Sequence, residues 1–292
     1  MKKEINLTLL LRFDKYDKLC NLYNDNIIEF SCAANWIDYY QKNQKTGDLF
    51  ECVFAHVDSK YDTSNLKDSH NKKMGENLFV LTNVDDGSKY LRYEPIILSP
   101  IMCFYGISMK QLLNNKEGHS SFKFDIDGFS KAFEYSSDYG ILIIDKPFEF
   151  INELSSQLSK CIMNNNNLTS ERFYKNFDPL NPIDASFVDY NKYKMTDLFF
   201  DQECVGQEIF WKDEKYSWQN EFRIIVKNIN FKQYYHPLNY DYKKNNLQIT
   251  LPNLKKYSRI ISLKDANEFI ISKSLDNPQE CVYSFIKKND MR

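Results

Sequence analysis

The chain has 292 residues, of which 42% are hydrophobic and 27% are charged, enough for one large domain or two small ones. Its 38 Lys and Arg residues are balanced by 40 Asp and Glu residues. A protein that coats nucleic acid carries a strong basic excess, so this balance argues against that class.

The N-terminal part of the chain is predicted to alternate strands with short helices. The patterns indicate strands at 7–13, 27–31 and 49–57, and helices at 14–23, where Asp14 is the expected cap, and at 35–44. Residues 58–76 are polar and lack periodicity, so we expect a mobile loop there.

The rest of the chain is predicted to be richer in strands. A hairpin is expected from 77–81 and 89–94, around the turn at 85–87. Further strands are expected at 96–105, 121–126, 139–144, 187–190, 216–226, 248–251, 259–263 and 281–286, and helices at 127–135 and 147–163. These elements predict one α+β domain over 1–292, with a split or mixed, mostly antiparallel sheet and a few flanking helices.

Several classes of site and location lack the sequence signals that they need. The seven cysteines contain no CxxC pair and the four histidines have no ligand spacing, so neither a disulfide framework nor a metal site is predicted. The eight glycines form no phosphate-binding loop, which argues against kinases, NTPases and dinucleotide-binding dehydrogenases. The apolar run at 7–11 is too short for a signal peptide, and no stretch approaches the ~20 apolar residues of a membrane span. We therefore expect a cytoplasmic protein without a membrane segment.

The strand predicted at 216–226 carries the main site candidate. Because side chains alternate along a strand, Gln219, Glu221 and Arg223 are expected on one face. The opposite face is mostly apolar and is expected in the core. It carries Trp218, Asn220, Phe222 and Ile224. A polar row in a β-rich protein needs hydrogen-bond partners or water. It is therefore either a site or a solvated face on which Glu221 forms a salt bridge with Arg223 or a neighbour.

Two family resemblances involve this strand. The order of Arg12, Ser31 and Gln219-x-Glu221 resembles the Arg-Ser-Glu class of ADP-ribosyltransferases. Most of the chain also resembles an uncharacterised bacterial family linked to toxin and phage-defence genes. The matching segments are Phe30-Ser31…Trp36, Asp48-Leu49-Phe50-Glu51 and Tyr216…Arg223. The serine motif departs from the transferase pattern, Ser-Thr-Ser, because this chain has Ser31-Cys32-Ala33 and so lacks the third hydroxyl.

The transferase resemblance implies NAD as the donor substrate and assigns roles to individual residues. Glu221 would stabilise the positive charge that develops on the ribose, and Gln219 would orient the acceptor. Arg12 would bind a phosphate, and Ser31 would hold the ribose or Glu221. The other candidates for contact with NAD are Arg223 and three aromatic residues for stacking on nicotinamide, Trp36, Tyr39 and Tyr40. Without the resemblance, Arg12 is equally a surface charge at a strand end, Ser31 a helix N-cap, and the aromatic residues core.

Three functions remain open at this level. The first is a mono-ADP-ribosyltransferase, a toxin or antiphage effector that modifies a protein, RNA or DNA and has an antitoxin or phage protein as a further partner. It predicts one cleft where Arg12, Ser31 and Glu221 converge. The second is a non-enzymatic adaptor that recognises a phage or partner protein through an aromatic-rich surface. It predicts that Glu221 and Arg223 simply pair on a solvated face. The third is a metal-dependent nuclease using Asp48, Glu51 and Glu221, which needs these carboxylates within metal-bridging distance.

Overall fold

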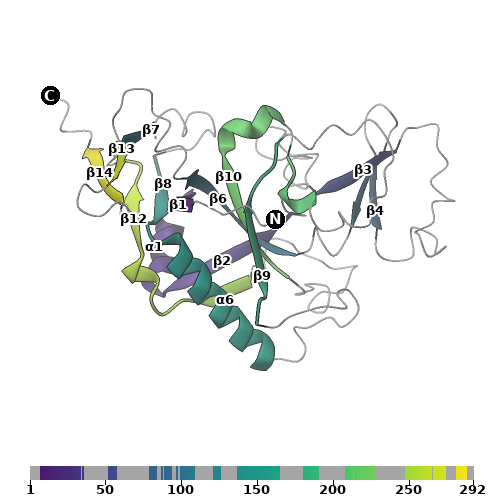
Figure 1. The fold of residues 1–292 in the computed structure, drawn as a ribbon, viewed down its shortest axis with the longest axis horizontal. Helices are drawn as coiled ribbons and strands as arrows, with labels where there is room; N and C mark the ends of the chain where they lie inside the picture. Colours follow the sequence, from purple (N-terminus) through teal and green to yellow (C-terminus); the bar gives the residue numbers. More distant parts are fainter. Residues whose placement is uncertain are drawn as a thin grey trace.

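The structure is a computed structural model that describes residues 7–33, 35, 52–57, 79–83, 87, 89–93, 97, 99–108, 121–125, 137–164, 180–190, 208–212, 214–227, 247–264, 266–273 and 281–287. A sheet of eight strands lies at the centre of the described part (Figure 1). Its strands are β1 (Leu7–Lys15), β2 (Ile27–Cys32), β6 (Pro100–Ser108), β8 (Tyr139–Ile144), β9 (Ile183–Phe187), β10 (Glu221–Val226), β11 (Leu247–Thr250) and β12 (Ser258–Ser262). Every ladder between these strands is antiparallel, which confirms the expected α+β class.

The sheet divides at β6, because β6 has two different neighbours on one of its edges. The main path runs β11-β2-β6-β1-β8-β12, and β10 pairs with β6 and β9. Tyr105 pairs with both Leu11 and Glu221, whereas Ile101 pairs with both Ser31 and Ile225. Since β10 follows one edge of β6 through both positions, β1 and β2 share the other edge in succession. This division gives the central sheet its split form.

Two smaller antiparallel sheets complete the described strands. One has the order β14-β13-β7 and is formed by β7 (Ser121–Asp125), β13 (Ala266–Lys273) and β14 (Cys281–Lys287). The other has the order β3-β5-β4 and is formed by β3 (Val53–Val57), β4 (Phe79–Asn83) and β5 (Lys89–Tyr93). The two lie at the left and right of the view in Figure 1. The hairpin expected from 77–81 and 89–94 is confirmed by the β4–β5 ladder.

The long helix α6 (Pro147–Asn164) covers one face of the central sheet. Its buried hydrophobic core residues follow the helical period, and they are Phe150, Leu154, Leu158 and Ile162. The Phe150 ring packs edge-on against Phe104 of β6 with the ring centroids 5.8 Å apart. Full burial of one such side chain stabilises the fold by roughly 1.5–3 kcal/mol. The proline at the first helical position is favourable there, since that residue has no intrahelical N–H partner to lose.

The second described α-helix, α1 (Tyr16–Asn24), begins two residues later than predicted. The reason is tertiary: β1 continues through Asp14 and Lys15, which pair with Gly140 and Tyr139 of β8. Asp14 therefore belongs to a strand and does not cap the helix. Within the described ranges, no helix has both the length and the apolar character of a membrane crossing.

Other predicted elements divide into confirmed, shifted and undescribed ones. The strand at 139–144 matches β8, and the helix at 147–163 matches α6 to within one residue. The strand expected at 187–190 lies earlier, as β9. The strand expected at 96–105 begins only at Pro100, as β6, a position that tolerates the missing N–H of proline. The strand β13 was not predicted. The loop at 58–76, the helix at 127–135 and all of the helix at 35–44 except Asn35 lie outside the described residues.

Candidate functional site

The predicted strand at 216–226 is wrong in its first half. Strand β10 begins only at Glu221, and the preceding residues form a 3-10 helix, η5 (Glu214–Gln219). Asn220 joins them with a left-handed φ of 40°, a conformation that asparagine tolerates better than most residues. Its carbonyl accepts the Gly106 N–H at 2.9 Å and its side-chain amide donates to the Gly106 carbonyl. Trp218, expected in the core, is 44% exposed as a consequence.

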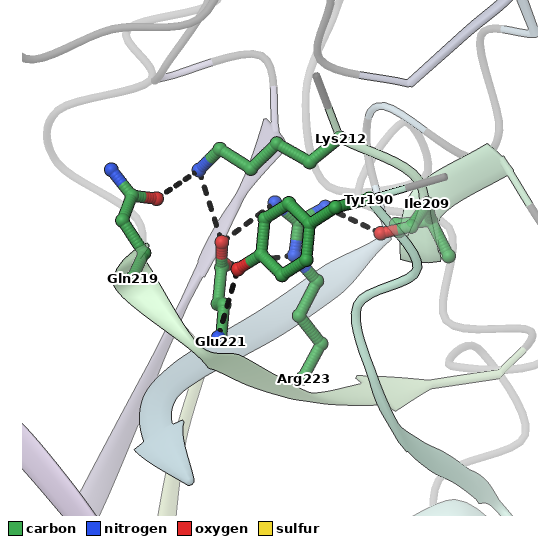
Figure 2. Close-up of polar contacts among 6 residues, drawn as sticks. All are labelled: Tyr190, Ile209, Lys212, Gln219, Glu221 and Arg223. Carbon is green, nitrogen blue, oxygen red and sulfur yellow. Dashed lines mark hydrogen bonds and ion pairs between the residues drawn. The ribbon is translucent and has the colours of Figure 1, made fainter. Parts of the chain in front are cut away.

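Gln219 and Glu221 nevertheless meet, because both bind the side chain of Lys212. The Lys212 ammonium donates to Gln219 Oε1 at 2.7 Å and to Glu221 Oε2 at 3.0 Å (Figure 2). The two residues predicted to be catalytic therefore lie together, but on a 3-10 helix and a strand rather than on one strand. Lys212 was not among the predicted site residues.

The segment that carries Lys212 is placed by the end of β9. It follows the 3-10 helix η4 (Glu208–Phe210). The N–H of Asp189 donates to the Phe210 carbonyl at 2.8 Å, and the N–H of Lys212 donates to the Asp189 carbonyl at 3.4 Å. These backbone bonds hold the lysine beside the start of β10, 9 residues away in sequence from Glu221.

Arg223 binds Glu221 from the inner side of the cluster. Its Nε donates to Glu221 Oε1 at 2.8 Å and its Nη2 to Glu221 Oε2 at 3.2 Å, which makes the pair bidentate. Its Nη1 donates to the Ile209 carbonyl (Figure 2). Arg223 is 0% exposed and Glu221 8% exposed, so the pair is buried and not on a solvated face. The predicted shared face of Glu221 and Arg223 is confirmed.

The surroundings keep Glu221 ionised. Burial opposes its ionisation, but the charges of Arg223 and Lys212 and a hydrogen bond from the Cys103 side chain hold the pKa of the carboxyl well below its usual range. The backbone N–H of Glu221 donates to the Tyr190 hydroxyl at 2.9 Å. Burial and the nearby Glu221 charge raise the pKa of Tyr190 to about 12, so its phenol stays neutral at pH 7. The cluster thus presents a carboxylate between two cations.

The cluster lies on the sheet face opposite α6. Residues paired across neighbouring strands point to the same face, so Leu11, Tyr105 and Glu221 share one. Phe104 and Phe222 alternate with them and pack in the same core cluster as Phe150 of α6. The described helix α6 and the Glu221 cluster are therefore on different sides of the central sheet.

Arg12 is not brought to Glu221. It follows Leu11 along β1 and therefore projects from the opposite face, where Leu142 is its cross-strand partner. Its Nη1 donates to the Glu29 carbonyl at 2.7 Å, and it lines a small recess together with Tyr23 and other apolar side chains of the α1 region. The prediction of one cleft for Arg12, Ser31 and Glu221 is therefore wrong, because the sheet itself separates Arg12 from Glu221.

Ser31 shares the face of Glu221 but lies some distance from it. Ser31 pairs with Ile101, which in turn pairs with Ile225, four residues along β10 from Glu221. Four residues correspond to about 13 Å of strand, in addition to the width of two strand spacings of about 4.8 Å each. Its hydroxyl accepts a hydrogen bond from the Asn35 side chain at 2.8 Å.

Several other predicted residues cannot be placed. Trp36, Tyr39, Tyr40, Asp48 and Glu51 lie outside the described residues. Within the described residues, no group of three or more His, Cys, Asp and Glu side chains is placed to hold a metal ion.

The site residues that were not predicted are Lys212, Tyr190 and Cys103. Each comes from a different segment and reaches Glu221 only through tertiary packing, so no periodic pattern could have indicated it. Comparisons of the chain with models of known families, with curated proteins and with solved structures give no match.

Proposed function

We propose that this chain is a mono-ADP-ribosyltransferase that transfers ADP-ribose from NAD to a macromolecule, with Glu221 as the catalytic carboxylate. The observation that carries the proposal is the ionised Glu221 joined to Gln219 through Lys212. A carboxylate that stabilises a developing cation must be ionised and fixed in place, and Arg223 supplies both conditions.

The reaction balances without a further reagent. The bond between ribose C1′ and the nicotinamide nitrogen breaks, and its electron pair leaves with nicotinamide, which becomes neutral. The ribose carries the resulting oxocarbenium charge, and Glu221 stabilises it by accepting a hydrogen bond from a ribose hydroxyl. An acceptor oxygen or nitrogen then bonds to C1′ and releases a proton, and Gln219 orients that acceptor. The products are nicotinamide, the ADP-ribosylated acceptor and a proton.

The ribose hydroxyl has to replace one present partner of Glu221. Arg223 is fully buried and holds both carboxylate oxygens, whereas Lys212 also contacts the half-buried Gln219. Exchange at Lys212 leaves Glu221 ionised by Arg223. Arg12 has no role in this scheme, because it projects from the other face of the sheet. A role as a toxin or antiphage effector acting in the cytoplasm is proposed on the family resemblance alone.

A second candidate is the non-enzymatic adaptor, favoured by one specific observation. Both oxygens of Glu221 are already bound by buried cations, which also describes an ion pair whose only task is to fix β10. In that case the carboxylate stabilises the fold and does not act on a substrate. The two candidates differ in whether the folded protein consumes NAD.

The test is NAD carrying a label in the adenylate portion, incubated with the purified full chain and a cell extract. We expect label transfer and nicotinamide release by the parent, and a rate lower by about 10²-fold or more in Glu221→Gln. Asp184→Asn removes an exposed carboxylate that pairs with Lys227 at 3.5 Å, and its rate should equal that of the parent. Absence of nicotinamide release by the parent would overturn the transferase proposal and favour the adaptor.

A second variant tests the role of Gln219 without removing the buried charge. Gln219→Ala keeps the Glu221–Arg223 pair. We expect it to reduce label transfer more strongly than nicotinamide release, because water still reaches the oxocarbenium ion when the acceptor is poorly oriented. Equal losses of transfer and release, in protein with parental thermal stability, would contradict the acceptor-orienting role.

A further inference from the structure

The Glu221 cluster places two cations on one carboxylate, and the two are bound differently. Arg223 has its Nε and Nη2 on Glu221 and its Nη1 on the Ile209 carbonyl, and it is fully buried. Lys212 reaches Glu221 from the side of the half-buried Gln219, by side-chain contacts of 3.0 and 2.7 Å. Loss of the lysine contact leaves the bidentate pair intact, whereas loss of the arginine contact would break it.

The surroundings of Lys212 suit a cation that changes partner. An ammonium group is a compact charge on a flexible four-carbon chain with three donors. Its Nζ lies 5.2 Å from the centre of the Tyr216 ring, whose face attracts a cation without neutralising it. The lysine therefore keeps a favourable contact when it leaves a carboxylate, and it can bind a new anion nearby.

The donor of the proposed reaction carries such an anion close to its ribose. When the ribose hydroxyl takes Glu221 Oε2, the Lys212 ammonium is released at the point where the donor lies. The diphosphate is attached to the 5′ carbon of the same ribose, within reach of a lysine side chain. The resemblance assigned phosphate binding to Arg12, but that residue projects from the opposite face of the sheet.

We propose, on the basis of the transferase function above, that Lys212 binds the diphosphate of the donor after the ribose hydroxyl replaces it on Glu221. Lys212 is thus a substrate-binding residue that distinguishes phosphorylated from unphosphorylated ribosides. The ligand class is a dinucleotide or nucleotide diphosphate.

A first experiment measures the binding of inorganic pyrophosphate by calorimetry in the presence of excess free ribose, whose hydroxyl replaces Lys212 on Glu221; this measurement is independent of activity. The parent should bind it, Lys212→Gln should bind about tenfold or more weakly, and Lys212→Arg should stay within a few-fold of the parent. Lys227→Gln is the matched control, because Lys227 pairs with Asp184 at the other end of β10, and its binding should equal that of the parent. Equal binding by Lys212→Gln, or no binding by the parent, would overturn the assignment.

A second experiment separates substrate binding from a structural role. It compares kcat/KM for NAD with kcat/KM for nicotinamide riboside, which lacks the diphosphate. Lys212→Gln should lower the ratio of the two values by about tenfold, through NAD alone. An equal loss for both donors would show that Lys212 only positions Glu221. If Lys212→Gln does not fold, competition on the parent decides, since pyrophosphate should inhibit cleavage of NAD and not of the riboside.

The two experiments also distinguish failure of this inference from failure of the transferase. If the parent binds pyrophosphate through Lys212 but cleaves neither donor, the anion site is supported and the transferase proposal fails. If the parent cleaves NAD but neither binds pyrophosphate nor is inhibited by it, the transferase proposal stands and the role of Lys212 fails.

Discussion

The buried pair of Glu221 and Arg223 gives the sharpest stability prediction, because the two partners should differ in cost when each is removed. Glu221→Leu leaves the guanidinium of a fully buried arginine with the Ile209 carbonyl but without its carboxylate. Removing one partner of a buried pair costs about 3–5 kcal/mol, and we expect a value in this range. Arg223→Met should cost less, since Lys212 still compensates Glu221 at 3.0 Å.

The double variant Glu221→Leu with Arg223→Met removes both charges and fills their space with apolar atoms. Its loss of unfolding free energy should be smaller than the sum of the losses in the two single variants by at least about 2 kcal/mol, because the double variant leaves neither Glu221 nor Arg223 as an unpaired buried charge. The assay is urea unfolding at pH 7 followed by circular dichroism, with the four proteins forming a double-mutant cycle.

The matched control is the exposed pair of Lys146 and Glu149 at 3.7 Å, whose side chains are 56% and 60% exposed. Solvent screening should reduce its coupling to below about 0.5 kcal/mol, and added salt should reduce it further. The coupling of the buried pair should change little with salt. A coupling below about 1 kcal/mol for Glu221 and Arg223, or a cost of Arg223→Met equal to that of Glu221→Leu, would refute the reasoning.

Two further predictions concern the same part of the chain. Burial opposes the charge of Glu221, but Arg223 and Lys212 hold the pKa of its carboxyl in the folded state below the ordinary 4.5. The carboxylate therefore stabilises the fold fully above pH 4.5. This contribution is lost as the pH falls through the folded-state pKa. Urea titrations from about pH 6 to about pH 3 should show a steeper loss in the parent than in Glu221→Leu, and parallel curves would contradict this. At Asn220, with φ of 40°, Asn220→Val should cost about 1–3 kcal/mol more than Asn220→Gly, since a β-branched residue resists this conformation and both variants lose the bond to Gly106. Equal urea midpoints for the two variants would show that the left-handed turn carries no strain.

Local sequence pattern was sufficient where neighbouring residues decide the structure. The apolar run at 139–144 predicted β8, and apolar residues at the helical period from Phe148 to Cys161 predicted α6. Phe148 and Cys161 themselves are exposed, and the buried face of α6 runs from Phe150 to Ile162. The helix buries one face and its apolar residues therefore repeat with the helical period, whereas all residues of β8 after Tyr139 are buried, which gives a continuous apolar run.

The same reasoning failed at 216–220, where the alternation of polar and apolar residues suggested a strand. The ladder between β10 and β6 ends at the pair of Glu221 and Tyr105, and Asn220 turns away with both its side chain and its carbonyl bonded to Gly106. Gly106 is a glycine in close packing, since a Cβ there would lie 2.6 Å from the Phe187 ring. A contact 114 residues away in sequence thus overrides the local period.

The sequence by itself determined that Glu221 and Arg223 lie on one face of a strand, because the alternation of side chains follows from strand geometry alone. Only the tertiary structure decided which residues meet them. Lys212 lies beside Glu221 because backbone hydrogen bonds at the end of β9 hold its segment there. Arg12 lies on the other face of the sheet from Glu221, because the register of β1 against β6 sets Leu11 level with Glu221. A shift of one residue in that register would have placed Arg12 on the same face as Glu221, and no local pattern in β1 specifies the register.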